Sequence, residues 1–361
     1  MKGKKKISII GTVGLPANYG GFETLVENLS SYHNLILMDN EITVFCSSKT
    51  YPEKKRNYLS TRLRYIPLNA NGIQSIPYDI LSLFFAIWNR TDVILLLGVS
   101  GAIVLPVLRL FSSARIITNI DGIEWRRQKW RGLAKIFLRF SEKMAIRFSD
   151  EVISDNVSIA EYVKDSYGID SHVIAYGGDQ AVNVGAIPVK EFDLPSKYSF
   201  SVCRIEPENN IHIILEAFSG LENYSLVIVG NWLNSDYGRE LHRQYSAYDN
   251  FYLLDPIYNL GKLYSLRSSS EFYLHGHSAG GTNPSLVEAM HFGVPIIAFD
   301  CDFNRSTTEN KALYFKDAKN LKLVISSLTE SVSETVSKEM VEVAKRRYTW
   351  KTVAKQYFNL F

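Results

Sequence analysis

Three short segments place glycines, charged side chains and helix-start signals directly after apolar, strand-like runs. They are residues 11–23, 203–210 and 280–290. Backbone N–H groups at a helix start attract anions, and a guanidinium binds phosphate oxygens through two parallel hydrogen bonds. We therefore expect these segments to bind a phosphate-bearing substrate and to stabilise negative charge that develops on it.

The strongest of these signals lies at residues 280–290. Asn283 is a good N-cap and Pro284 suits the first helical position, which predicts a helix that starts beside two glycines. The loop amides and the helix dipole would form a cradle for a diphosphate. Glu288 lies about one and a half turns further on, where its carboxylate could accept two hydrogen bonds from ribose hydroxyls. The alternative is an ordinary capped helix with a solvent-facing glutamate. The residues expected to line the cradle are Gly280, Gly281, Thr282 and Asn283.

The segment 203–210 offers a cation at the end of a strand-like run. Arg204 is expected to stabilise the departing diphosphate, and Asn209 to contribute to the same donor site. The alternative for Arg204 is a surface ion pair with Glu206 or Glu208. In segment 11–23 a glycine-rich turn precedes a helix, but its spacing does not fit the dinucleotide-binding pattern. A tight strand-to-helix turn is the alternative there.

Short runs rich in β-branched residues alternate with longer helical patterns, which predicts an α/β fold with two parallel sheets. The runs are apolar without a period of two, as in strands buried on both faces. Ligands of such sheets bind beyond the carboxyl ends of the strands. The expected strands are 6–11, 42–46, 63–66, 93–97, 115–120, 151–154 and 172–175, then 198–203, 225–230, 251–254, 271–275, 295–299 and 313–315.

Composition agrees with two ordinary globular domains. The chain has 361 residues, of which 46% are hydrophobic and 21% charged. Its net charge of +3, from 40 basic and 37 acidic residues, does not indicate a nucleic-acid partner. Three widely spaced cysteines are typical of reduced thiols in a cytoplasmic protein. We expect a hinge near residues 176–179, with an N-terminal domain over 1–178 and a second domain over 179–340.

Two apolar segments raise the question of a membrane. The basic N-terminus precedes an apolar run that is too short for a signal peptide, so we interpret residues 6–11 as the first strand. Residues 76–111 are very apolar, but charged residues, Pro106 and glycines interrupt them. Buried strands and helices of an α/β domain explain this segment better than a membrane span.

Taken together, these motifs resemble the family 4 glycosyltransferases. The likeness covers nearly the whole chain and is closest to bacterial rhamnosyltransferases of surface-polysaccharide assembly. It implies the GT-B fold, in which two Rossmann-like domains with parallel sheets face each other across a cleft. It also implies a closing helix over residues 341–361 that returns to the first domain. The segments that carry the likeness are 18–24, 121–127, 204–210, 281–285 and 348–351.

The chain departs from the wider family at three positions. Gly280 stands where the first of two glutamates, with seven residues between them, is usual. Asn209 replaces a lysine that pairs with the arginine, so Arg204 and the loop amides must stabilise the diphosphate without it. Asp121 stands where a histidine is frequent, which argues against any role based on imidazole there.

The resemblance implies a retaining transfer from a nucleotide-diphosphate sugar, dTDP-L-rhamnose above all. Arg204 and Asp121 are the candidate catalytic residues. The departing phosphate could take the acceptor's proton, so no protein base is required. Asp121 could instead cap the turn before Gly122. Further donor contacts are expected from Gly20 and Gly21, and the acceptor side is expected to include Tyr19, Glu23, Asp121 and Glu124.

No metal or other cofactor is expected. Asp300 and Asp302 mimic a D-x-D metal motif, but loop capping is the better interpretation in a GT-B protein. His275 and His277 lie two residues apart on a strand and lack a third ligand, which argues against zinc.

A basic amphipathic helix is expected over residues 125–148. Its basic residues recur every four positions beside an apolar stripe that includes Leu133 and Phe140. Such a helix predicts attraction to anionic lipid at the inner face of the plasma membrane, and a lipid-linked or oligosaccharide acceptor fits that place. A solvated basic face is the alternative. Two rival functions remain open, a nucleotide-sugar epimerase and a non-catalytic GT-B subunit.

Overall fold

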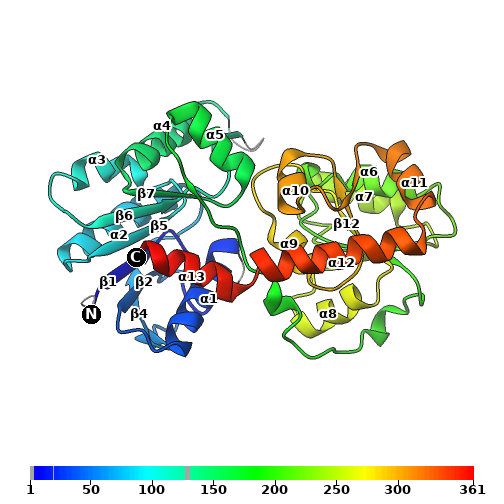
Figure 1. The fold of residues 1–361 in the computed structure, drawn as a ribbon, viewed down its shortest axis with the longest axis horizontal. Helices are drawn as coiled ribbons and strands as arrows, with labels where there is room; N and C mark the ends of the chain where they lie inside the picture. Colours follow the sequence, from blue (N-terminus) through cyan, green and yellow to red (C-terminus); the bar gives the residue numbers. More distant parts are fainter. Residues whose placement is uncertain (1–3, 19, 127–130) are drawn as a thin grey trace. The chain divides into compact units, whose positions relative to one another are not determined.

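The computed structural model describes residues 4–18, 20–126 and 131–361. The chain divides into two compact units (Figure 1). The first consists of Met1–Tyr176 with Trp350–Phe361, and the second of Gly177–Thr349. Each unit is a sheet covered by helices, and each is described by itself below.

The sheet of the first unit has eight strands within the described residues, in the order β3-β4-β2-β1-β5-β6-β7-β8. All neighbours are parallel except β3 and β4, which are antiparallel. β1 lies between β2 and β5, and all five residues of β5 are buried. The strands are β1 (Lys6–Ile10), β2 (Glu41–Ser47), β3 (Asn57–Tyr58), β4 (Thr61–Ile66), β5 (Val93–Leu97), β6 (Arg115–Asn119), β7 (Glu151–Ser154) and β8 (His172–Val173).

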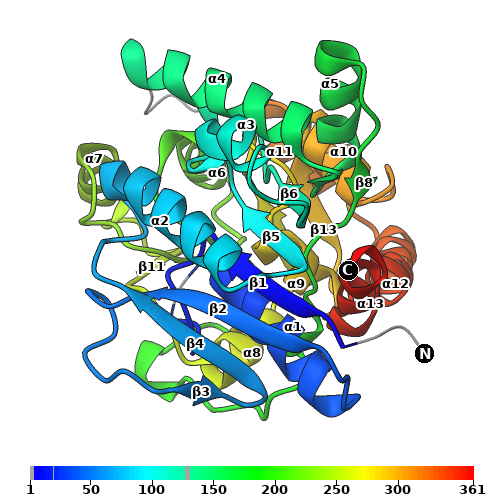
Figure 2. The same cartoon turned by 90° about the vertical axis from the view of Figure 1, so that its left-hand side faces the viewer.

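Helices cover both faces of this sheet. Figure 2 shows α2 and α3 over one face and α1 with α13 over the other. α13 follows the second unit in sequence, yet it packs against α1. The helices are α1 (Gly21–Leu35), α2 (Ser75–Trp88), α3 (Leu105–Leu108), α4 (Leu133–Phe148), α5 (Val157–Tyr167) and α13 (Trp350–Leu360), with short 3-10 turns η1 (Gly72–Gln74), η2 (Ala102–Val104) and η3 (Glu124–Arg126).

The second unit has a wholly parallel sheet, in the order β11-β10-β9-β12-β13-β14. Its core contains Phe218, Trp232, Phe272 and Phe315, each at most 2% exposed. The strands are β9 (Ser199–Val202), β10 (Leu226–Val229), β11 (Phe251–Leu254), β12 (Phe272–His275), β13 (Ile296–Phe299) and β14 (Leu313–Phe315). The helices are α6 (Ile211–Phe218), α7 (Asp236–Tyr245), α8 (Leu260–Ser268), α9 (Pro284–Met290), α10 (Asp302–Thr307), α11 (Ala318–Ser326) and α12 (Glu330–Arg347), with η4 (Asp179–Ala181), η5 (Lys190–Phe192) and η6 (Pro207–Asn209).

The predicted fold class is confirmed, because both units are parallel-sheet α/β units and every expected strand is present. The helix expected over 125–148 was wrong at its start. Trp125 lies in the turn η3, residues 127–130 lie outside the described residues, and α4 begins at Leu133 after Gly132, whose φ is 55°. The closing helix was expected over residues 341–361. Residue 341 instead lies in α12, which packs on α9, and the C-terminal helix α13 of the first unit begins at Trp350.

The apolar segment 76–111 forms α2, β5, η2 and α3. Among the residues that the structure describes, no helix has both the length and the apolar character that crossing a membrane requires.

Candidate functional site

Arg204 follows β9, the strand at the middle of the second sheet. Its side chain is 52% exposed, and its guanidinium pairs with Glu206, whose Oε1 lies 3.8 Å from one guanidinium nitrogen. At such exposure this ion pair contributes little. The surface ion pair considered from the sequence is therefore present, but it does not immobilise the guanidinium, which keeps most of its surface available to an anion.

Asn209 anchors the segment that carries Arg204. It is 4% exposed, and its Nδ2 donates to the carbonyl oxygen of Arg204 at 2.8 Å. Its Oδ1 lies 2.9 Å from Nδ1 of His277, which follows β12. Both ends of the amide are thus engaged by the protein. Asn209 is thereby a brace between the loops that follow β9 and β12, and the direct donor contact expected from the sequence stays a prediction.

His277 is itself held in place by a second contact. Nδ2 of Asn304 in α10 donates to the carbonyl oxygen of His277 and to that of Phe299, in each case at 2.8 Å. His275, the last residue of β12, is 3% exposed, and burial lowers the pKa of its imidazole well below the usual range. These histidines serve packing and bracing. Within the described residues, no group of three or more His, Cys, Asp or Glu side chains is placed to hold a metal ion.

The loop from Gly280 to Asn283 leads into α9, and the helix begins where the sequence predicted. Asn283 is the N-cap, with its Oδ1 accepting from the Ser285 amide at 3.0 Å, and Pro284 is the first helical residue. Gly280 adopts a φ of 92°, a conformation that favours glycine. A glutamate would be strained in this backbone conformation. Thr282 is 4% exposed, and Gly281 is partly buried.

Glu288 is held by two residues that the sequence did not indicate. Its Oε2 accepts from Arg267 of α8, and its Oε1 accepts from Gln180 of η4 at 2.8 Å. The Arg267 side chain is 3% exposed and that of Glu288 18%. The carboxylate therefore has a fixed orientation and a balanced charge. Each oxygen retains a second lone pair that can accept a hydroxyl hydrogen bond.

In the first unit, the glycine-rich turn after β1 is closed by Glu23. This side chain is 7% exposed, and its Oε1 accepts from Thr12 Oγ1 at 3.1 Å and from the Val13 amide at 2.7 Å. Glu23 thus holds the turn in place, and its expected acceptor-side role stays a prediction. Gly20 has a φ of 138°, and a Cβ there would lie 1.9 Å from Glu23 Oε2. Gly21 begins α1 against the ring of Tyr176. Tyr19 lies outside the described residues.

Asp121 lies just beyond β6 in a polar cluster of the first unit. Its φ is 60°, a strained value for a residue with a Cβ. Its amide donates to Asn119 Oδ1 at 2.8 Å, and its Oδ1 accepts from Tyr176 Oη at 3.0 Å. Asn119 Nδ2 donates in turn to Tyr357 Oη of α13 at 2.6 Å. Burial and the neighbouring Asp121 charge raise the pKa of Tyr176 well above its usual range, so its hydroxyl remains a donor. Glu124 is half-buried in η3.

The D-x-D motif is engaged by cations of the protein itself. Asp300 Oδ1 accepts from Arg305 Nε at 2.5 Å, and Lys316 Nζ lies 3.6 Å from Asp300 Oδ2. These partners lower the pKa of the Asp300 carboxyl, with the Arg305 hydrogen bond as the main cause. Asp302 lies in the first turn of α10. All three cysteines are free thiols, and burial raises the pKa of Cys46 to about 11.

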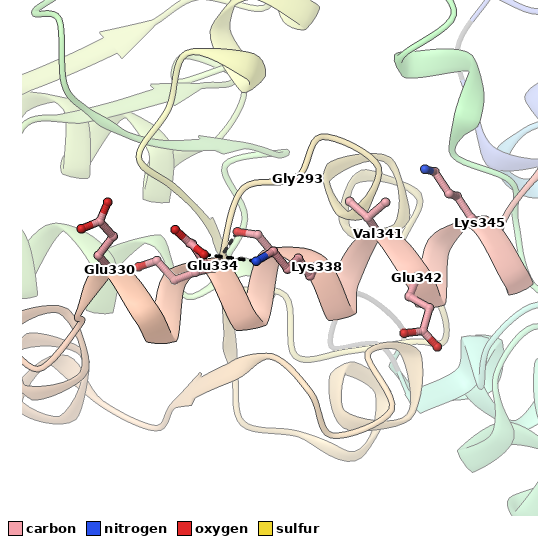
Figure 3. Close-up of a pocket in the computed structure, with 9 residues that line it drawn as sticks. Gly293, Glu330, Glu334, Lys338, Val341, Glu342 and Lys345 are labelled. Atoms are coloured by element: carbon pink, nitrogen blue, oxygen red, sulfur yellow. Dashed lines mark hydrogen bonds and ion pairs between the residues drawn. The ribbon is translucent and has the colours of Figure 1, made fainter.

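A shallow hollow of about 640 Å³ follows the exposed side of α12 (Figure 3). Its lining consists mainly of short polar and charged side chains, among which Lys338 Nζ pairs with Glu334 Oε2 at 3.1 Å. Neither the loops after β9 and β12 nor Glu288 contribute to it.

Two family models match the chain, one on each unit. Residues 4–179 match the model described as Domain of unknown function (DUF1972), and residues 186–346 match Glycosyl transferases group 1. No curated protein matches the chain.

Solved structures similar in fold span the whole chain. The sucrose-phosphate synthase of Thermosynechococcus elongatus has a TM-score of 0.81 at 17% identity, covering 99% of this chain and 98% of that one. Anabaena HepE in complex with UDP and glucose has a TM-score of 0.70 at 14% identity, covering 98% of each chain. The catalytic domain of Arabidopsis thaliana starch synthase IV bound to ADP and acarbose has a TM-score of 0.68 at 13% identity, covering 99% of each.

The two parallel-sheet units and these similarities define a GT-B protein. Residues 186–346 form a group 1 glycosyltransferase domain, and the chain is accordingly a glycosyltransferase. This domain contains Arg204, the 280–283 loop and Glu288, the donor-side residues singled out from the sequence.

Proposed function

We propose that this glycosyltransferase moves a sugar from a nucleotide-diphosphate donor to a glycan or lipid-linked acceptor, with retention of anomeric configuration. The donor proposed first is dTDP-L-rhamnose, and the setting is polysaccharide assembly at the inner face of the plasma membrane. The second unit binds the donor, and the first unit, with Asp121, serves the acceptor or the transferred sugar.

One observation supports the donor half of this proposal above the others. Arg204 follows β9, and the 280–283 loop follows the neighbouring strand β12, both within the group 1 domain. The Arg204 guanidinium is exposed, and the loop that carries it is held by Asn209. The carboxyl ends of adjacent parallel strands are where such sheets bind ligands. A guanidinium and loop amides aimed at the diphosphate would stabilise the charge that grows on it, and one well-placed donor is worth roughly 3–4 kcal/mol.

The remaining parts of the site have roles consistent with this chemistry. Glu288, oriented by Arg267 and Gln180, accepts hydrogen bonds from the ribose hydroxyls. The departing phosphate takes the proton of the acceptor hydroxyl, so this step requires no protein base. Asn209 and His277 fix the loop that carries Arg204.

The group 1 glycosyltransferase match favours transfer over sugar epimerisation, and it leaves the non-catalytic subunit as the rival to test. Purified protein is screened by thermal shift against nucleotide sugars that include dTDP-rhamnose, UDP-glucose and GDP-mannose. A tight ligand raises the melting temperature by mass action. We expect one donor to do so, and we expect Arg204→Ala to abolish the shift. If no nucleotide sugar shifts the melting temperature, the chain is a scaffold and the proposal fails.

A further inference from the structure

A second concave site lies entirely within the first unit. It is a pocket of about 580 Å³ between the turn η3 and the helices α4 and α5. Its lining combines cationic and aromatic side chains, and none of the described residues that line it is Asp or Glu. The cations are Arg126, Arg139, Lys143 and Arg147.

The aromatic wall of this pocket is fixed by a buried carboxylate. Glu142 is 1% exposed, and its Oε1 accepts from Trp125 Nε1 at 3.3 Å, Tyr162 Oη at 2.6 Å and Tyr167 Oη at 2.7 Å. Three donors on one oxygen compensate the carboxylate charge. Burial, followed by the hydrogen bond to Glu142, raises the pKa of Tyr162, so its hydroxyl stays a donor. The negative charge is thereby kept beneath the wall and out of the pocket.

The cations are arranged around this wall. The Arg126 guanidinium lies 4.9 Å from the centre of the Tyr162 ring and 5.3 Å from that of Trp125, and the Arg139 guanidinium also lies 5.3 Å from Trp125. Stacking on aromatic faces limits the freedom of a guanidinium without neutralising it. Arg139, Lys143 and Arg147 follow one another at intervals of four residues and so project from one side of α4. The pocket thus concentrates positive charge on a rigid support.

An apolar rim adjoins these cations. Phe140 and Ile136 of α4 belong to the lining, and they are 49% and 66% exposed. Leu133, one turn before Ile136, is 84% exposed. The buried side of α4 is formed by other residues, among them Leu138, Ala145 and Ile146. The exposed apolar residues therefore do not serve the core of the unit.

We propose that this pocket binds the phosphate or diphosphate group of an ester whose apolar part lies over Ile136 and Phe140. Arginine binds phosphate oxygens in forked geometry, and lysine adds a point charge. This proposal rests on the proposed function, because it takes the bound ester to be the sugar acceptor of that reaction. The acceptor is then a phosphate-bearing amphiphile. It differs from a diffuse attraction of the basic helix to anionic surfaces, since it assigns the effect to the cations of one pocket.

The test compares two double variants of the full chain that remove the same charge. Arg139→Ala with Lys143→Ala alters the pocket, whereas Lys54→Ala with Lys55→Ala alters basic residues before β3 that lie outside its lining. All four side chains are exposed, so neither variant changes the core. Co-sedimentation is measured with phosphatidylcholine vesicles with and without phosphatidic acid, and calorimetry is measured with inorganic pyrophosphate.

We expect binding to fall about tenfold or more in the first variant. In the second variant it should stay within about threefold of the parent protein, because surface charges outside the pocket are screened. Binding to phosphatidic acid vesicles identifies a lipid source of the phosphate, and binding to pyrophosphate alone identifies a soluble ester. Equal losses in the two variants, or no binding to either probe, overturn the proposal. Neither probe requires turnover, and pyrophosphate binding is measured in the Arg204→Ala background, so that the donor site does not contribute and a failure of donor chemistry is distinguishable from a failure of this site.

Discussion

Arg267, on α8, donates to Glu288 Oε2 on α9 from a position where only 3% of its side chain is exposed. Its guanidinium also lies 5.7 Å from the centre of the Phe292 ring. A buried charge costs free energy unless it is paired, so each member of this pair depends on the other. The pair orients the carboxylate to which we assign the ribose of the donor.

Replacing Arg267 by Met should therefore harm both stability and donor binding. The partly buried carboxylate loses its partner, and we expect the free energy of unfolding to fall by about 3 kcal/mol. Urea denaturation measures this loss. Adding Glu288→Gln to Arg267→Met should restore part of the stability, because it removes the unpaired charge. Additive losses in the double variant would show that the two residues are not coupled.

Asn209→Ala should affect catalysis through the position of Arg204. The substitution removes the hydrogen bonds to the Arg204 carbonyl and to His277, so we expect kcat to fall about tenfold with little change in the KM for the donor. Steady-state kinetics separates the two parameters. A rise in KM with kcat unchanged would instead support the direct donor contact that the sequence predicted.

Asp79 should make stability depend on pH in a defined direction. It is 3% exposed, and burial raises the pKa of its carboxyl well above the usual value. Above about pH 4 the unfolded chain loses this proton and the folded chain keeps it, so the folded state loses stability as pH rises through that range. Asp79→Asn cannot ionise and escapes this loss.

We therefore compare the difference in melting temperature, Asp79→Asn minus parent protein, at two pH values. We expect this difference to be more positive at about pH 7 than at about pH 4.5. Any cost of burying the new amide is the same at both pH values and cancels in the comparison. Thermal denaturation of both proteins at the two pH values checks this. A constant difference would mean that Asp79 is already ionised in the fold.

The sequence sufficed for most of the fold because the strands are continuous apolar runs. Val93–Leu97 and Phe251–Leu254 were expected with the same bounds that the structure shows. β3 was missed because a strand of two residues, Asn57 and Tyr58, is too short to show a hydrophobic period. It is defined by its pairing with β4. The start of α4 was missed because the basic and apolar pattern continues upstream of Gly132, the residue after which the helix begins.

The candidate site was predictable only where its signals are local. The cap at Asn283 and the proline after it fix the start of α9 within a few residues. The partners of Glu288 lie 21 positions away at Arg267 and 108 positions away at Gln180, and nothing near either residue announces the contact. The side chains of Glu23 and Asn209 could contact substrate or protein equally, and only the fold shows which protein groups they contact.

The central claim is that Arg204 stabilises the departing diphosphate, and Arg204→Ala tests it most directly. Arg243→Ala is the matched control, because Arg243 is also an exposed arginine of the second unit, 77% exposed and paired with the nearby Glu240. The measurement is the initial rate of nucleoside diphosphate release from the donor identified by thermal shift. We predict that Arg204→Ala lowers this rate about 10²- to 10³-fold while Arg243→Ala leaves it unchanged. A rate within twofold of the parent protein for Arg204→Ala would contradict the account.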